Sequence, residues 1–193
     1  MPSDPLRGFL LRTLIWLPIC FFAWYYMANL LIWPLVPLAD LVLGAALPGV
    51  LEAVQLGPRE IQFLTHLEVT APDGRVGTIA FSINPLMYGY NLPLLAALMI
   101  AAGETHFSWT RLLVSYVALL PFQLWGVSFD FVKTVIFDAG PEVSAQIGIT
   151  GWGLEAVALG YQFGYLMMPV ISATAVWILL NRRFINSLLV REA

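Results

Sequence analysis

Four long apolar stretches, separated by short polar interruptions, account for most of this chain. About 20 consecutive apolar residues suffice for a helix to cross the hydrocarbon core of a bilayer. Of the 193 residues, 60% are hydrophobic and 11% are charged, whereas a soluble domain needs a more polar surface. The sequence therefore predicts an all-α integral membrane protein with about four transmembrane helices, folded as one membrane domain over residues 1-193.

The predicted crossings cover residues 13-36, 85-102, 112-137 and 154-180. The first is longer than the apolar region of about 7 to 15 residues that a cleaved secretory signal contains. We therefore expect it to be retained as a signal-anchor helix. Its many Trp and Tyr residues suit helix ends in the headgroup region, where such amphipathic rings are enriched.

Two further elements are expected between the first and second crossings. Pro and Gly interrupt the apolar run around residues 38-47, which predicts a short helix at the membrane interface or re-entering it; the sequence leaves open whether it spans. Residues 61-83 alternate apolar and polar side chains on both sides of a Pro72-Asp73-Gly74 turn. This pattern predicts a small extracytoplasmic β-hairpin. An isolated hairpin is marginally stable, so it should rest on the membrane, on the interfacial segment or on a partner.

The basic residues predict the orientation, because Lys and Arg near helix ends stay cytoplasmic. Four crossings place six of them on one side: Arg7, Arg12, Arg111, Arg182, Arg183 and Arg191. The exceptions are Arg59, Arg75 and Lys133. A fifth crossing would divide the basic residues between the two faces. We therefore expect a multi-pass protein with both termini in the cytoplasm.

Asp130 and Lys133 are the oppositely charged pair inside an apolar stretch. Their i,i+3 spacing lets the two side chains meet on one helix face. Ionisable groups at membrane depth are costly and often functional, so this pair is a candidate for a proton or ion path. The alternative is that both lie near the outer helix end, where Lys133 reaches the headgroups.

Two further polar sets are candidates for a partner or ligand face. Glu155 and Gln162 share a face of the last crossing, with Tyr161 and Tyr165 on an adjacent face. With Asp130 they would form a polar groove, or they would bond neighbouring helices.

Asn84, Tyr88 and Asn91 form the second set, at i, i+4 and i+7, with Gly89 allowing close approach. This stripe would bind a peptide or a lipid headgroup, or would cap the start of the helix and bond to its neighbours.

Catalysis, cofactor binding and metal binding have little support in the sequence. Cys20 lies among apolar residues, a setting that makes a thiol inert. His66 and His106 fall on opposite sides of the membrane in the predicted topology, and no His, Cys, Asp or Glu spacing resembles a zinc motif. We therefore expect no enzyme activity, no cofactor and no metal. A formal charge of -3 argues against nucleic acid as a partner.

Three segments carry a resemblance to a known family. They are Leu14-Ile15-Trp16-Leu17-Pro18, the run from Asn84 to Leu94, and Tyr161 to Pro169 before a terminal Asn181-Arg182-Arg183-Phe184. In these segments the chain resembles the exosortase H-associated membrane proteins. The resemblance implies a small protein of the bacterial inner (cytoplasmic) membrane that accompanies an exosortase, a cysteine transpeptidase-like membrane enzyme that processes C-terminal sorting tails. The Cys, Arg and His set of an exosortase is not matched here, because Cys20 precedes both histidines in the wrong surroundings.

The predicted function follows from the resemblance and the polar residues together. We expect a noncatalytic accessory subunit in protein sorting, in contact with membrane lipid and with another membrane protein, an exosortase or its substrate. The alternative is a small transporter or channel subunit with a polar path through Asp130, Lys133 and Glu155.

Overall fold

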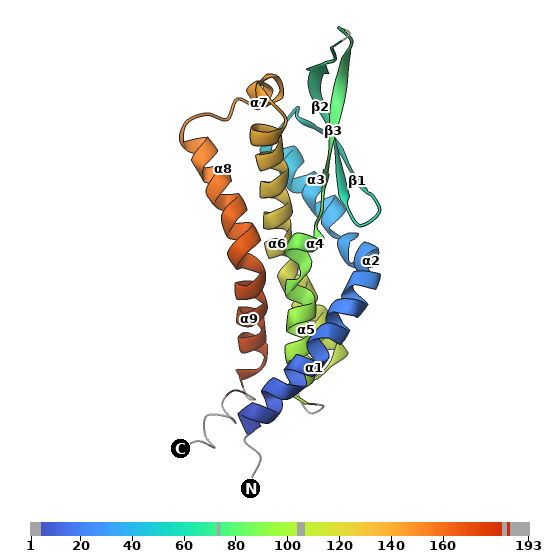
Figure 1. Ribbon diagram of the computed structural model, residues 1–193, viewed down its shortest axis with the longest axis vertical. Coiled ribbons are helices and arrows are strands. Elements are labelled where there is room, and N and C mark those ends of the chain that lie inside the picture. Colours follow the sequence, from blue (N-terminus) through green and yellow to red (C-terminus); the bar gives the residue numbers. More distant parts are fainter. Residues whose placement is uncertain (1–4, 73, 104–106, 183–184, 186–193) are drawn as a thin grey trace. The chain divides into compact units, whose positions relative to one another are not determined.

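The computed structural model describes residues 5-72, 74-103, 107-182 and 185, and its elements are mostly helical (Figure 1). The N-terminal half contains α1 (Pro5–Tyr26), α2 (Ala28–Ile32), α3 (Leu35–Ala46), β1 (Leu51–Leu56), β2 (Ile61–Thr70), β3 (Val76–Ile83), α4 (Leu86–Gly89) and α5 (Asn91–Ala101). The C-terminal half contains α6 (Trp109–Lys133), the π-helix η1 (Thr134–Asp138), α7 (Pro141–Ile147), α8 (Trp152–Gln162), the π-helix η2 (Phe163–Met167) and α9 (Met168–Leu180).

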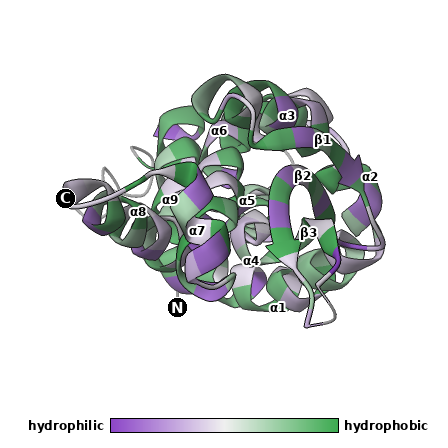
Figure 2. Ribbon diagram, turned by 90° about the horizontal axis from the view of Figure 1, so that it is seen from above, coloured by the Kyte–Doolittle hydropathy of each residue, from purple (hydrophilic) through white to green (hydrophobic). Residues whose placement is uncertain are grey.

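Four helical segments of the described chain are long and apolar enough to cross a membrane. They are Leu6–Tyr26, Ala28–Ala46, Trp109–Asp138 and Trp152–Leu180, and Leu86–Ala101 is a shorter apolar helix. Their ribbons lie largely in the hydrophobic range of Figure 2. The protein is therefore a mostly helical membrane protein with a small sheet, as the sequence predicts.

Two predicted crossings differ in their bounds from the structure. The helix predicted over 13-36 is interrupted at Met27, where α1 ends and α2 begins, and again before Pro34. Pro34 has no N–H to continue a helical ladder and restricts the residue before it, so a new helix starts there. The segment predicted over 85-102 begins with the single turn α4 and continues as α5, which shortens its regular part.

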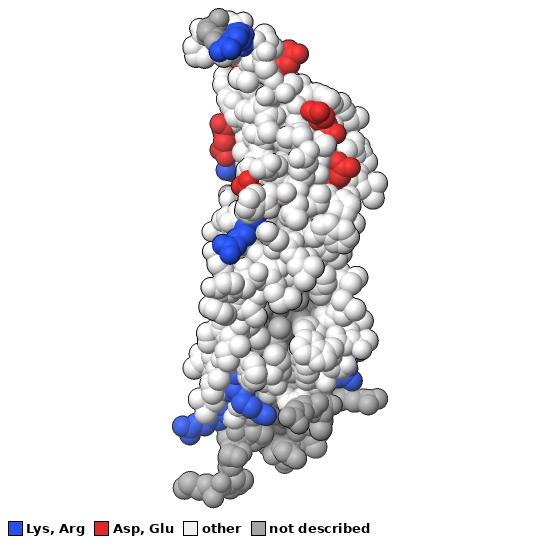
Figure 3. Space-filling model, turned by 90° about the vertical axis from the view of Figure 1, so that its right-hand side faces the viewer, with Lys and Arg blue, Asp and Glu red and all other residues white. Residues whose placement is uncertain are grey.

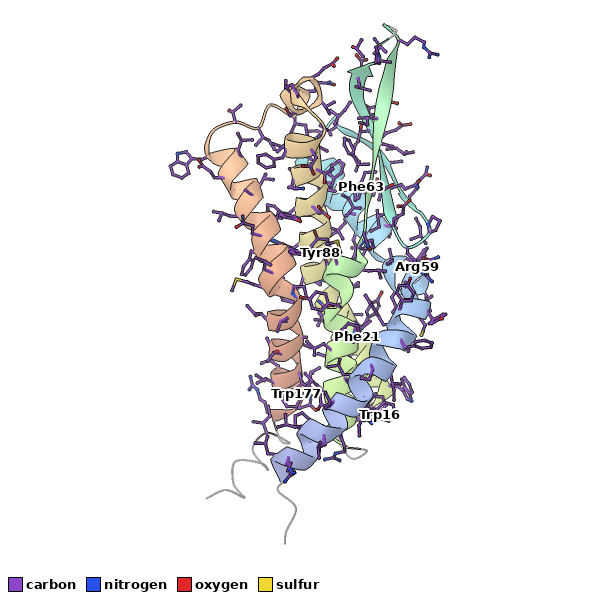
Figure 4. The ribbon with its side chains drawn as sticks, in the orientation of Figure 1. Trp16, Phe21, Arg59, Phe63, Tyr88 and Trp177 are labelled. Carbon is purple, nitrogen blue, oxygen red and sulfur yellow. The ribbon has the colours of Figure 1, made fainter. Side chains whose placement is uncertain are left out.

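The chain forms two compact units. The first contains Met1–Met27, Gly89–Pro121 and Pro169–Ala193, and the second contains Ala28–Tyr88 and Phe122–Met168. In the first unit α1 packs along α5. Phe9 stacks on Trp177 at 5.5 Å between ring centroids, and Ala101 and Ala102 complete this small core (Figure 4).

The second unit contains a three-stranded antiparallel sheet in the order β1-β2-β3, where the sequence predicted a two-stranded hairpin. β1 follows a turn at Pro48-Gly49 and pairs with β2 from Leu56↔Ile61 to Leu51↔Thr65. The turn between them holds Arg59 at φ 62°, and the Arg59 N–H donates to Asn29 Oδ1 at 2.9 Å. The third strand turns a marginal hairpin into a sheet that can be stable on its own.

The sheet rests on helices of its own unit, one of the supports that the sequence allows. Alternate residues of β2 are buried, and Phe63 stacks on Phe131 of α6 at 4.5 Å between centroids (Figure 4). Phe81 of β3 meets the same ring edge-on at 5.9 Å. The predicted segment 38-47 covers most of α3 and ends one residue beyond it. Leu35, Ala39 and Leu43 of this helix are buried at i, i+4 and i+8, and the helix packs against β1.

Candidate functional site

Tyr88, labelled in Figure 4, lies in the second unit, and the polar side chains near it form what we call the polar cluster: Asp130, Tyr161 and Tyr165. Its side chain is 1% exposed, and its hydroxyl makes no hydrogen bond with any described residue. Among ionisable groups, Asp130 interacts most strongly with this hydroxyl, followed by Tyr161 and Tyr165. A buried hydroxyl needs a hydrogen-bond partner, and the carboxyl group of Asp130 beside it is able to accept one.

The Tyr88 ring is held in place by close contact with α6. A Cβ added at Gly126 would overlap this ring, so only glycine leaves room for it. Gly160 faces the Phe129 ring in the same way, and a Cβ at Gly164 would lie 3.2 Å from the Gly126 Cα. Small residues spaced as Gly160-x-x-x-Gly164 let membrane helices approach closely. The cluster is therefore built on tight packing between α6 and the α8–η2 helix, and this spacing was a sequence signal that the prediction missed.

Lys133 is engaged by Asp138 rather than by Asp130. Its Nζ lies 2.6 Å from Asp138 Oδ2, and it also stands 5.3 Å from the centroid of the Tyr161 ring. In an α-helix, residues five apart do not face each other, but η1 is a π-helix, whose i→i+5 geometry brings such residues together. Within the described residues, Asp130 therefore has no direct ion pair, although the sequence spacing allowed one with Lys133.

The remaining residues of the last crossing lie around this cluster. The Tyr161 and Tyr165 rings are nearly parallel, with an interplanar angle of 6° and centroids 6.0 Å apart. Trp125 Nε1 donates to the Gly160 carbonyl at 3.1 Å and ties α6 to α8. Glu155 and Gln162 are both exposed, and the structure shows no hydrogen bond or ion pair between them and Asp130 or Lys133 in the part it describes.

The three residues of the predicted stripe, Asn84, Tyr88 and Asn91, have different contacts in the structure. Asn84 Oδ1 accepts the Leu86 N–H at 3.0 Å and so caps the start of α4. Asn91 belongs to the first unit, is fully buried, and donates from Nδ2 to Ser172 Oγ of α9 at 3.2 Å. Both contacts match the structural alternative for this stripe, while Tyr88 alone turns toward an acidic group.

The cysteine and the described histidine, the residue types suited to nucleophilic or metal chemistry, belong to different units. Cys20 is partly buried in α1 of the first unit, and His66 is exposed on β2 of the second. His106, Arg183 and Arg191 lie outside the described residues. Among the residues that the structure covers, no three His, Cys, Asp or Glu side chains are grouped to hold a metal ion.

The two units differ in charge. The ranges of the second unit contain nine acidic and three basic residues, a formal charge of -6, and those of the first contain three acidic and six basic residues, a formal charge of +3. Figure 3 shows several of the acidic side chains over the second unit. The polar cluster therefore lies in an acidic environment that favours cationic partners.

Comparison with known proteins identifies a family. The family model described as exosortase H-associated membrane protein matches residues 3–184, which is nearly the whole chain. No curated protein and no solved structure matches the chain.

Proposed function

Because the chain belongs to the exosortase H-associated membrane proteins, we propose that it is a noncatalytic accessory subunit that binds an exosortase in the bacterial inner membrane. The family description supports an association with the exosortase system. The role of a docking subunit, the partner and the side of the membrane are the content of the proposal.

The observation that carries the proposal is the open edge of the sheet. β3 pairs with β2 on one side only, and Val76 to Thr78 at its start are exposed, with Val76 at 61%. An exposed edge strand offers unpaired N–H and C=O groups to an extended segment of another chain. Phe63 and Phe81 pack against Phe131 of α6, which holds the edge strand in place. A segment that binds there therefore meets a preformed edge, and few further residues of this chain lose conformational freedom.

Contacts within the second unit support placing this edge outside the cytoplasm. The Glu68 N–H of β2 donates to Gln146 Oε1 of α7 at 2.9 Å, and Thr70 Oγ1 donates to Glu142 Oε1 at 2.8 Å. The sheet is therefore on the same side as α7, which follows the C-terminal end of α6 and η1.

The basic residues then suggest which side that is. Arg111 begins α6, and the helix rises about 28 Å from Arg111 to Asp130 at 1.5 Å per residue. This rise matches a hydrocarbon core about 30 Å thick. With Arg111 at the cytoplasmic surface, Asp130 in the same helix would reach the outer boundary, and α7 with the sheet bonded to it would follow on the outer side.

Edge substitutions test the proposal. The tagged full chain is co-expressed with the exosortase of the same organism, and the exosortase captured from solubilised membranes is quantified. Val76→Lys with Ala80→Lys charges the edge strand, which opposes strand addition, and the captured amount is expected to fall about tenfold, equivalent to about 1.4 kcal/mol. His66→Lys adds a positive charge to the exposed side of the central strand, one where the edge variant adds two, and should leave capture unchanged.

The two variants separate docking from general effects of charge. Equal loss with His66→Lys would mean that charge, and not the free edge, governs the result. Absence of exosortase in the wild-type capture would contradict the proposed function itself.

A further inference from the structure

We propose that Asp130 is the binding site for a lysine or arginine side chain that a membrane helix of the partner presents at the outer membrane boundary. This inference rests on the proposed function and names the chemistry of the contact. It concerns a site on the helices of the second unit, apart from the open edge of the sheet.

The first step is the charge balance around Asp130. The carboxyl group lies in the apolar helix α6, and the neighbouring cation, Lys133, is engaged 2.6 Å from Asp138 and over the Tyr161 ring. No direct ion pair neutralises Asp130 among the described residues. A carboxylate at the edge of the hydrocarbon region is stabilised by a cation that another helix supplies.

The second step is the arrangement behind the carboxyl group. The Tyr88 hydroxyl is buried and faces Asp130. Gly126 fixes the ring that carries it. Tyr88 is therefore a positioning residue: its hydroxyl can orient one carboxylate oxygen from the inside while Asp130, which is partly exposed, remains accessible from the outside.

The third step is the depth of the site and the nature of its occupant. About 28 Å of helix separates Arg111 from Asp130, which puts the carboxyl group where lysine and arginine side chains of other helices extend toward the headgroups. The formal charge of -6 on the second unit favours a cation, and the parallel Tyr161 and Tyr165 rings offer faces for an ammonium or guanidinium group. The amine of a lipid headgroup shares this chemistry, but a protein side chain agrees with a protein described as associated with an exosortase.

The experiment compares exosortase capture by matched carboxylate variants of the full chain. Asp130→Asn keeps the shape of the side chain and removes its charge, and capture is expected to fall about tenfold. Glu155→Gln removes an exposed carboxylate from the same unit and should leave capture unchanged. Tyr88→Phe keeps the ring against Gly126 but removes the hydroxyl, so a smaller loss is expected at an unchanged melting temperature.

Charge exchange identifies the occupant. Asp130→Lys should abolish capture, and one Lys→Asp or Arg→Asp substitution in the membrane helices of the exosortase should restore it. Capture by Asp130→Asn at the wild-type level, with the wild type binding, would overturn the inference and leave the proposed function in place. Failure of the wild type to capture exosortase would overturn the proposed function instead.

A lipid occupant is tested on the same purified variants. Native mass spectrometry counts the phosphatidylethanolamine molecules that wild type and Asp130→Asn retain from nanodiscs containing phosphatidylethanolamine and phosphatidylcholine. We expect equal retention. Loss of phosphatidylethanolamine from Asp130→Asn, with exosortase capture unchanged, would assign the site to lipid and overturn the inference.

Discussion

At the scale of single residues, glycines set the geometry of the polar cluster. Gly126 leaves room for the Tyr88 ring, Gly160 leaves room for the Phe129 ring, and a Cβ added at Gly164 would lie 3.2 Å from the Gly126 Cα. None of these three glycines has a positive φ, so they are required for space and not for backbone conformation. In lipid the hydrophobic effect does not hold helices together, and close van der Waals packing of this kind contributes to their association instead.

Gly126→Ala therefore tests the packing directly. The added methyl overlaps the Tyr88 ring, and overpacking of this kind costs about 1 to 3 kcal/mol. We expect a lower melting temperature for the purified protein, followed by the loss of helical circular dichroism. Gly44→Ala in α3 is the matched control, because nothing lies within 4 Å of its added Cβ, and it should leave the protein unchanged or slightly more stable. Equal melting temperatures for wild type and Gly126→Ala would show that Tyr88 moves freely.

Asn91 illustrates a polar residue used for helix cohesion. It is fully buried, and its Nδ2 donates to Ser172 Oγ between α5 and α9. Asn91→Leu removes this bond and should cost about 0.6 to 2 kcal/mol, the range measured for hydrogen bonds between membrane helices. Thermal unfolding measures the change. Thr174→Ala provides the control, because its exposed hydroxyl bonds within its own helix; a loss as large as that of Asn91→Leu would argue against a special role for the Asn91 contact.

At the scale of elements, Gln146 of α7 makes two hydrogen bonds to the backbone of the sheet, beside the bond between Thr70 and Glu142. Gln146 accepts the Glu68 N–H at 2.9 Å and donates to the Glu68 carbonyl at 2.8 Å, so it pairs with β2 as a backbone neighbour would. Gln146→Ala should leave the Glu68 amide without its hydrogen bond. Hydrogen–deuterium exchange around residue 68 should then accelerate about five- to tenfold, which corresponds to a free energy of local opening lower by about 1 kcal/mol. Gln55→Ala, at an exposed position on β1, should not change exchange at residue 68.

Elements were predictable where a local pattern is decisive. The strands β2 and β3 and their antiparallel pairing were recognised, because period and turn chemistry are local signals; Asp73 of the predicted turn lies outside the described residues. β1 was missed because the apolar run out of α3 ends at Leu51, and Leu51–Leu56, with Glu52 and Gln55, does not alternate strictly; its pairing with β2 shifts register between Leu51 and Ala53. The π-helix η1 was also missed, and with it the pairing of Lys133 with Asp138.

For the candidate site, too, local sequence signals predicted some features and not others. Tyr88 and Asp130 were each singled out from the sequence, but on different stripes and with different neighbours. Their meeting depends on Gly126 and on packing between segments distant in the chain, which periodicity does not reveal. Sequence patterns thus identified the polar residues, and the structure identified which of them face one another.

At the scale of the whole molecule, the open question is which apolar segments complete a crossing. By length, Ala28–Ala46 qualifies and Leu86–Ala101 is shorter. Whether Ala28–Ala46 or Leu86–Ala101 completes the second crossing, Arg12 and Arg111 lie on the same side of the membrane. The two topologies differ in the side of the membrane on which the sheet lies. The bonds from β2 to α7 favour crossing by Leu86–Ala101, because α7 follows directly after α6 and η1 in the chain, so the sheet belongs on the side that the chain reaches by crossing with α6.

Single cysteines decide between the two topologies. In a Cys20→Ala background, Thr78→Cys on β3, Thr150→Cys before α8 and Thr110→Cys at the start of α6 are exposed reporters for a membrane-impermeant thiol reagent applied to intact cells. The expected result is labelling at 78 and 150 from outside and at 110 only after permeabilisation, since the proposed topology places Arg111 in the cytoplasm, where basic residues near helix ends tend to stay. Labelling at 150 but not at 78 in intact cells would instead make Ala28–Ala46 a complete crossing. The open edge would then face the cytoplasm, where it could not meet a partner on the outer surface.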